Sequence, residues 1–175
     1  MKEPDFSVEI HLLGGKGHKV LIKKLKNSAF KDNSPFWIGP YCTIKDIIVE
    51  GKDVRLKLSD ANYSEEPWEK DCNLAVVFIG DTNSFNDIKT IYKNNKKYCS
   101  NAVKYIRVYN NEDHIDEQTK KKFEEFSKNI EASFEIEEIE DNLISDNFLK
   151  EIIKEVRIQK EIENEEKENR CCIIS

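Results

Sequence analysis

Residues 5–20 have the sequence D-F-S-V-E-I-H-L-L-G-G-K-G-H-K-V, and the rest of the predicted fold is organised around them. Apolar side chains alternate with polar ones between Phe6 and Leu12, which is the period of a half-buried β-strand. A glycine-rich turn follows, and the stretch from Lys19 to Leu25 can begin a helix. Where a strand, a glycine turn and a helix meet, free backbone N–H groups and the positive end of the helix dipole converge. The sequence therefore predicts an anion-binding loop over residues 14–20.

This candidate loop departs from the complete phosphate-binding motif, G-x-x-x-x-G-K-[ST]. If Gly14 and Lys19 stand for the first glycine and the lysine, the loop is one residue short. His18 then replaces the second glycine, and Val20 lacks the hydroxyl that binds Mg²⁺ in the complete motif. A glycine turn with a lysine beside it is the alternative interpretation. The residues assigned to nucleotide binding in this loop are Gly14, Gly15, Lys16, Gly17, His18, Lys19 and Val20.

The composition fits one globular domain and excludes several classes of partner. With 175 residues, of which 38% are hydrophobic, the chain can bury a full core. The formal net charge is −6 and no basic stripe is visible, so we expect no nucleic-acid partner. Neither a membrane-spanning run nor a secretory signal is visible, so we expect the chain to stay in the cytosol. Cys42, Cys72 and Cys99 lack metal-ligand spacing, so neither a zinc site nor a disulfide framework is expected.

The rest of the chain alternates strand-like and helix-like stretches. After a loop over residues 27–41, residues 42–60 predict an antiparallel hairpin, and Leu74–Ile79 predicts a central strand buried on both faces. Further elements are expected as strands at 103–109 and 133–139 and as helices at 84–95, 118–129 and 145–167. We therefore predict an α/β fold, with a mostly parallel six-stranded sheet, one antiparallel edge strand and helices on both faces. Ligands bind such sheets outside the carboxyl ends of the strands, where residues 14–20 fall.

Several short segments are similar to the motifs of one known family. Ser34-Pro35 with Ile38-Gly39 is similar to an S-P-T-I-G loop, Leu58–Ala61 to the strand end before D-T-A-G-Q-E, and Val108–Asp113 to a segment with N-K-x-D. Together with residues 14–20, these segments resemble the Ras superfamily of small GTPases, and within it the Rab branch. The resemblance extends over nearly the whole chain. It implies a small-GTPase-like P-loop fold that binds GTP or GDP.

The resemblance also implies roles for single residues outside the loop. Asn110 and Asp113 correspond to the amide and carboxylate that read the guanine base. Asn111 takes the place of the lysine that packs over the phosphate loop, and Asp60 corresponds to the carboxylate that holds Mg²⁺ through water.

Positions that the family uses for hydrolysis are substituted. Phe36 or Trp37 replaces the threonine whose hydroxyl closes on Mg²⁺ and the γ-phosphate. Tyr63 and Ser64 replace the glycine and the glutamine that approach the phosphate and orient the attacking water. We therefore expect GTP hydrolysis to be very weak or lost, and Mg²⁺ binding to be weak or absent.

The C-terminus resembles a prenylation signal. Cys172-Ile173-Ile174-Ser175 fits C-a-a-X, and with Cys171 the ending also fits the Cys-Cys endings of Rab proteins. A single lipid anchors a protein only marginally. Residues 161–168 are acidic and would be repelled by an anionic leaflet, so we expect a second lipid on Cys171. The expected organisation is a GTPase-like domain over residues 1–160 and an acidic tail over 161–175 that ends in the prenylation motif.

These features predict a Rab-like protein on the cytoplasmic face of an intracellular or plasma membrane, with a cytosolic pool, that recruits effector proteins in vesicle traffic. The resemblance also implies an exchange factor and a prenyl-binding chaperone as partners. Trp37, Ile38 and Trp68 fall in loops that small GTPases use for partners, so they are candidate anchors, with local packing as the alternative. The alternative function is a pseudo-GTPase, a membrane-tethered module that binds no nucleotide and recruits partners constitutively.

Overall fold

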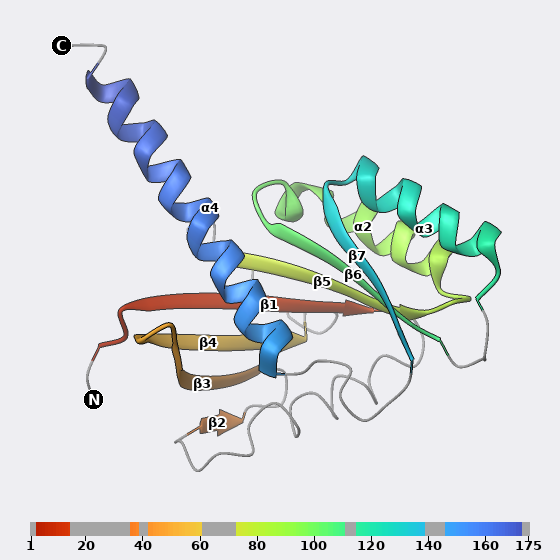
Figure 1. The fold of residues 1–175 in the computed structure, drawn as a ribbon, viewed down its shortest axis with the longest axis horizontal. Helices are drawn as coiled ribbons and strands as arrows, with labels where there is room; N and C mark the ends of the chain where they lie inside the picture. The colour runs from red at the N-terminus through yellow and green to blue at the C-terminus, as the bar shows by residue number, and fades with distance from the viewer. Residues whose placement is uncertain are drawn as a thin grey trace.

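The computed structural model describes residues 3–14, 36–38, 42–60, 73–110, 115–138 and 146–172. For residues 36–38, 138, 146 and 166–172 it describes the backbone only. The described chain forms an α/β fold in which helices cover both faces of one mixed sheet (Figure 1).

The sheet contains the six predicted strands and one short additional strand. In chain order its strands are β1 (Phe6–Gly14), β2 (Phe36–Ile38), β3 (Cys42–Val49), β4 (Lys52–Asp60), β5 (Leu74–Asp81), β6 (Val103–Asn110) and β7 (Ala132–Glu138). Their order across the sheet is β2-β3-β4-β1-β5-β6-β7. Neighbouring strands run parallel from β4 through β1, β5 and β6 to β7, whereas β3 is antiparallel to β4. The predicted six-stranded, mostly parallel sheet with an antiparallel strand at one edge is therefore confirmed.

Two local features explain that edge. Glu50 and Gly51 join β3 to β4 with positive φ angles of 51° and 75°, the conformation that a two-residue hairpin turn requires. Beyond β3, the backbone of β2 pairs antiparallel with it, from Phe36 opposite Lys45 to Ile38 opposite Thr43. Residues 36–38 were expected in a loop, and this expectation is wrong because three residues are too few to show a strand period.

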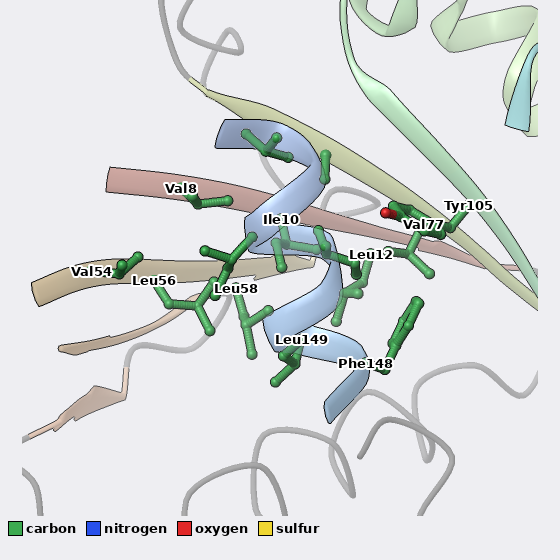
Figure 2. Close-up of a cluster of buried hydrophobic side chains, with 14 of the residues drawn as sticks. Val8, Ile10, Leu12, Val54, Leu56, Leu58, Val77, Tyr105, Phe148 and Leu149 are labelled. Atoms are coloured by element: carbon green, nitrogen blue, oxygen red, sulfur yellow. The ribbon is translucent and has the colours of Figure 1, made fainter. Parts of the chain in front are cut away.

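Helix α4 (Asp146–Cys172) covers one face of the sheet. Its buried side chains pack on the apolar residues of β1, β4, β5 and β6, and they are Phe148, Leu149, Ile152, Ile153 and Val156. Figure 2 shows Phe148 and Leu149 of this helix over the side chains of the central strands. The C-terminal part of the helix extends beyond the sheet (Figure 1), and the helix continues five residues further than its predicted end at 167. Among the described residues, no helix is both long and apolar enough to cross a membrane.

Helices α2 (Phe85–Cys99) and α3 (Glu117–Asn129) cover the opposite face. Ile88 and Phe123 are fully buried there, against Val76 and Phe78 of β5. The ring of Phe85 meets the ring of Phe123 edge to face at 5.1 Å between centroids, so the two helices also pack on each other. Strand β5 is covered on both faces, which confirms the prediction drawn from its lack of alternation.

The first strand is more deeply buried than its alternating pattern predicts. Val8, Ile10 and Leu12 face α4, as expected. On the other face Ser7 is exposed, but Glu9 and His11 are also buried, at 8% and 3% exposed. The half-buried strand is therefore a wrong prediction, because the polar groups of this face are satisfied by one another rather than by water.

Candidate functional site

The carboxyl ends of five parallel strands meet at one edge of the sheet. In the order of the strands across the sheet, this edge carries Asp60, Gly14, Asp81, Asn110 and Glu138. Strand β1 lies at the point where the strand order reverses, with β4 on one side and β5 on the other. Open α/β sheets bind ligands at this kind of switch point. The structure therefore places Gly14, the first residue of the predicted loop, at the edge where the fold favours a ligand.

Asp60 lies beside the end of β1. It ends β4 opposite Leu12, two residues before Gly14, and its side chain is on the α4 face of the sheet. Asp60 is only 8% exposed, so its carboxylate is held at a fixed place next to the start of residues 14–20. This position suits a carboxylate that holds Mg²⁺ through water. No group of three or more His, Cys, Asp and Glu side chains within the described ranges is arranged to bind a metal.

Asp81, at the end of the next strand, is occupied by the turn into α2. Its Oδ1 accepts hydrogen bonds from the Ser84 hydroxyl at 2.6 Å and from the backbone N–H of Asn83 at 2.9 Å. The backbone N–H of Asp81 in turn donates to the Ser84 hydroxyl at 3.1 Å. These bonds fix the β5–α2 connection. They also take up the Asp81 oxygen that would otherwise face a ligand.

Gly80 makes this connection possible. A Cβ atom built on Gly80 would lie 2.6 Å from the Cβ of Ser84 and 2.9 Å from Cδ1 of Ile88. Both distances are shorter than a carbon–carbon contact can be, so only glycine lets the first turn of α2 approach β5 this closely. This role of Gly80 was not predictable, because one glycine at a strand end fits many local structures.

A buried arginine connects strand β6, which ends at Asn110, to α4. Arg107 of β6 is 5% exposed, and it forms ion pairs with Glu135 and Glu137 of β7. Its guanidinium carbon lies 3.7 Å from the centroid of the Phe148 ring, in a cation–π contact. Burial raises the pKa of Glu137 and Glu135 adds to this rise, while Arg107 opposes it. Arg107 therefore joins β6, β7 and the first turn of α4 three residues before Asn110.

A second buried charge cluster lies on β1 and β4, on the face away from α4. The Glu9 Oε1 atom lies 2.9 Å from both His11 Nε2 and Lys57 Nζ. It also accepts a hydrogen bond from the Ser59 hydroxyl at 3.2 Å. Burial alone would raise the pKa of Glu9, but the hydrogen bonds from His11 and Lys57 outweigh it and lower this pKa from 4.5 to about 2. The neighbouring pairs Glu9–Lys57 and His11–Ser59 in the β1–β4 register bring these groups together.

Sequence reasoning missed both clusters for the same reason. Charged residues that alternate with apolar ones are normally assigned to solvent. In β1 and β4 the available signal was the complementary charge of Glu9 and Lys57 on two predicted strands. In β6 the available signal was a single arginine, Arg107, in a segment whose other residues are typical of a buried strand. The acidic residues Glu135 and Glu137 lie on the next predicted strand.

The structure brings three of the predicted site residues to the same edge, namely Gly14, Asp60 and Asn110. Trp37 and Ile38 lie in the short edge strand β2, and Cys171 and Cys172 are the last two residues of α4. The other predicted residues lie outside the described part of the chain, and they are Gly15, Lys16, Gly17, His18, Lys19, Val20, Asn111, Asp113 and Trp68.

No protein-family model matches this chain. No curated protein matches it either. The sheet order and the residues at the strand ends are therefore the observations from which a function can be argued.

Proposed function

We propose that the protein is a Rab-like small GTP-binding protein with very weak or no GTP hydrolysis. The observation that carries the proposal is the placement of Gly14, Asp60 and Asn110 at one edge of the sheet. Gly14 and Asn110 end strands that are two positions apart, which corresponds to about 10 Å across the sheet. An extended nucleotide can bridge this distance, with its phosphates at β1 and its base at β6.

The roles proposed within this site are those that the resemblance to small GTPases implies. Residues 14–20 would hold the phosphates through backbone N–H groups and Lys19. Asp60 would position Mg²⁺ or water beside them, and Asn110 with Asp113 would bind the guanine edge. Val20 has no hydroxyl to complete an Mg²⁺ site, so nucleotide binding should depend little on Mg²⁺. Hydrolysis should be slow because Tyr63 and Ser64 cannot orient the attacking water.

The second candidate function is a pseudo-GTPase that binds no nucleotide. A specific observation favours it. Among the strand ends whose side chains the structure describes, β4 and β5 carry the carboxylates of Asp60 and Asp81, and none carries a lysine or an arginine. A nucleotide is an anion, so the positive charge it needs would have to come from Lys16, Lys19 or a bound cation.

Nucleotide content separates the two candidates. The purified protein is denatured, and any nucleotides that it releases are resolved by anion exchange. In a second measurement, the melting temperature of the folded protein is recorded with added GDP or GTP. The proposal predicts bound guanine nucleotide and a rise in melting temperature, because a ligand that binds only the folded state stabilises it. Lys19→Ala and Asp113→Ala should each abolish the rise.

Asn94→Ala, at an exposed asparagine of α2, is the matched control and should leave the rise unchanged. If neither nucleotide is released and none raises the melting temperature, the scaffold function replaces the GTP-binding one. A strict requirement for Mg²⁺ would show that Val20 is not at the magnesium position.

We further propose that the C-terminus is prenylated and tethers the protein to the cytoplasmic face of a membrane, where it recruits effectors. Metabolic labelling with isoprenoid should mark the wild type and not a Cys171→Ser/Cys172→Ser variant, and only the wild type should sediment with membranes. A Cys99→Ser variant is the control, because Cys99 is buried at the end of α2 and should not affect labelling. Equal labelling of all three proteins would contradict the anchor.

A further inference from the structure

The last part of α4 is a helical arm with an exposed apolar and acidic side. The arm comprises residues 157–172, after Val156, which is the last α4 residue to pack in the core. Sixteen helical residues extend about 24 Å. Ile158 and Ile162 are 50% and 52% exposed, and the exposed Glu161 and Glu165 lie on the same side of the helix, at spacings of three and four residues.

Over residues 157–165, where side chains are described, the two positive side chains are engaged in ion pairs and only partly exposed. Arg157 pairs with Glu50 at 2.7 Å and with Glu161 at 3.7 Å, and Lys160 pairs with Glu163 at 3.7 Å. Glu161 remains 65% exposed in its pair. Ile158 and Ile162 are one helical turn apart, so they form one contiguous apolar patch between the glutamates. The arm therefore offers two isoleucines and two glutamates to a partner.

The complementary surface is on α2. Lys89, Lys93, Lys96 and Lys97 are all exposed, and their spacings of four, three and one place them in a row along one side of the helix. Asp87 is the one acidic residue of α2. This row is the reverse of the overall charge of −6, so it stands out as a local positive surface.

An aromatic seam lies next to the lysine row. Tyr92 of α2 and Phe126 of α3 are half-buried, and their ring centroids are 5.8 Å apart. Phe85 contacts the same Phe126 ring at 5.9 Å. The seam can receive aliphatic side chains, while the lysines beside it receive carboxylates. Amphipathic helices bind in this way, with apolar anchors at i and i+4 on an apolar surface between charged edges.

We propose that the arm of one copy binds the α2 lysine row of a second copy. Glu161 and Glu165 would pair with Lys93 and Lys97, which have the same spacing of four residues. The α2 helix has 15 residues, about 22 Å, so its length also matches that of the arm.

The arm cannot reach the lysine row of its own chain. It continues α4 without a break on one face of the sheet, whereas α2 covers the other face (Figure 1). The contact can be made twice around a two-fold axis, each copy giving one arm and receiving the other, which forms a closed dimer. This proposal is independent of nucleotide binding and of lipidation.

Sedimentation equilibrium of the full, unlipidated chain tests the proposal with two charge reversals. The row reversal is Lys93→Glu/Lys97→Glu, and the arm reversal is Glu161→Lys/Glu165→Lys. The wild type should dimerise reversibly, and each reversal alone should raise the dissociation constant at least about tenfold, since like charges then face each other in both contacts. Raising the salt from about 0.1 M to about 1 M shortens the screening length from about 10 Å to about 3 Å and should also weaken the wild-type dimer.

The decisive sample is an equimolar mixture of the two reversed variants. In a mixed dimer both contacts again join opposite charges, so dimerisation should return to nearly the wild-type strength. Lys121→Glu/Lys128→Glu, at two exposed lysines of α3, is the control and should leave the dimer intact. Circular dichroism of every variant checks that the helices are retained.

Three outcomes would overturn the proposal. The wild type could stay monomeric over the whole concentration series, the mixture could fail to restore the dimer, or the control could weaken it as much as the row reversal. If the protein is monomeric and the row reversal instead abolishes binding to vesicles that contain phosphatidylserine, the lysine row is a membrane contact. If neither dimer nor vesicle binding is seen, the row remains available to an acidic protein partner and the self-association is wrong.

Discussion

Replacing Glu9 with glutamine should destabilise the protein in a way that depends on pH. Glu9 is the common acceptor of His11, Lys57 and Ser59 within the sheet. Its pKa is lowered from 4.5 to about 2 in the folded protein. A group with a lowered folded-state pKa stabilises the fold above its unfolded pKa, and this contribution is lost as the pH falls through the folded pKa. The Glu9 contribution should therefore be complete above about pH 5 and lost as the pH approaches 2.

The size of the effect follows from the same shift. The pKa of Glu9 falls by about 2.5 units, and each unit corresponds to about 1.4 kcal/mol, so Glu9 contributes about 3 kcal/mol near pH 7. Glu9→Gln keeps the shape of the side chain but removes the charge, and it should lower the free energy of unfolding by about this amount. At pH 3 linkage leaves less than half of the effect, because the unfolded carboxyl is then protonated and the folded one is only starting to be.

Urea unfolding followed by circular dichroism at pH 7, 5 and 3 measures this difference. Asp46→Asn is the matched control. Asp46 pairs with Arg55 in the neighbouring strands with donor–acceptor distances of 2.8 and 2.9 Å, but its side chain is 44% exposed, against 10% for Glu9. The pKa of Asp46 is also lowered, mainly by its hydrogen bond to Arg55, yet solvent screening should make its loss much smaller. A loss for Glu9→Gln that is the same at pH 7 and pH 3 would refute the electrostatic explanation and leave only side-chain packing.

Three further substitutions test the core and the buried contacts behind the candidate site. Gly80→Ala should lower the free energy of unfolding by about 1–3 kcal/mol, because the new Cβ would lie 2.6 Å from the Cβ of Ser84. An unchanged urea midpoint would show that α2 can shift to make room. Arg107→Met should lower the free energy of unfolding by about 3 kcal/mol, measured with heat or urea, because it leaves the Glu137 carboxylate without its partner. No change would mean that the attraction within the ion pair only offsets the desolvation of its two charges. Ile152→Ala should lower the free energy of unfolding by about 2–5 kcal/mol, since Ile152 of α4 is fully buried against the sheet. A loss below about 1 kcal/mol would mean that α4 can move to close the cavity.

The mostly parallel sheet and its antiparallel strand were predictable because the apolar patterns were strong. Leu74–Ile79 could only be a strand covered on both faces, and the Glu50–Gly51 turn is typical of a hairpin, so the sheet and its antiparallel edge followed from the sequence. The short strand β2 was not predictable, because its pairing with β3 depends on backbone contacts that leave no period in three residues. The extension of α4 to Cys172 was also missed, because its apolar stripe ends at Val156.

The candidate site was predictable only where a strand end fixes a residue in space. Gly14, Asp60 and Asn110 could be placed at one edge because parallel strands bring their carboxyl ends together. The role of Asp81 could not be predicted, because its carboxylate is used by Ser84 and Asn83 across a turn that Gly80 alone permits. A strand end therefore shows where a side chain lies, but its hydrogen-bond partners decide whether it is available to a ligand.

The two buried charge clusters lie behind the candidate site and not within it. Glu9 precedes Gly14 by five residues, about 17 Å along β1, and Arg107 precedes Asn110 by three residues, about 10 Å along β6. Each cluster joins adjacent strands, so it should set the stability of the sheet rather than contact a ligand. Variants of Glu9 and Arg107 should therefore change the free energy of unfolding while any melting shift caused by nucleotide persists. Variants of Lys19 and Asp113 should do the opposite, and this separation distinguishes loss of a ligand site from loss of the fold that presents it.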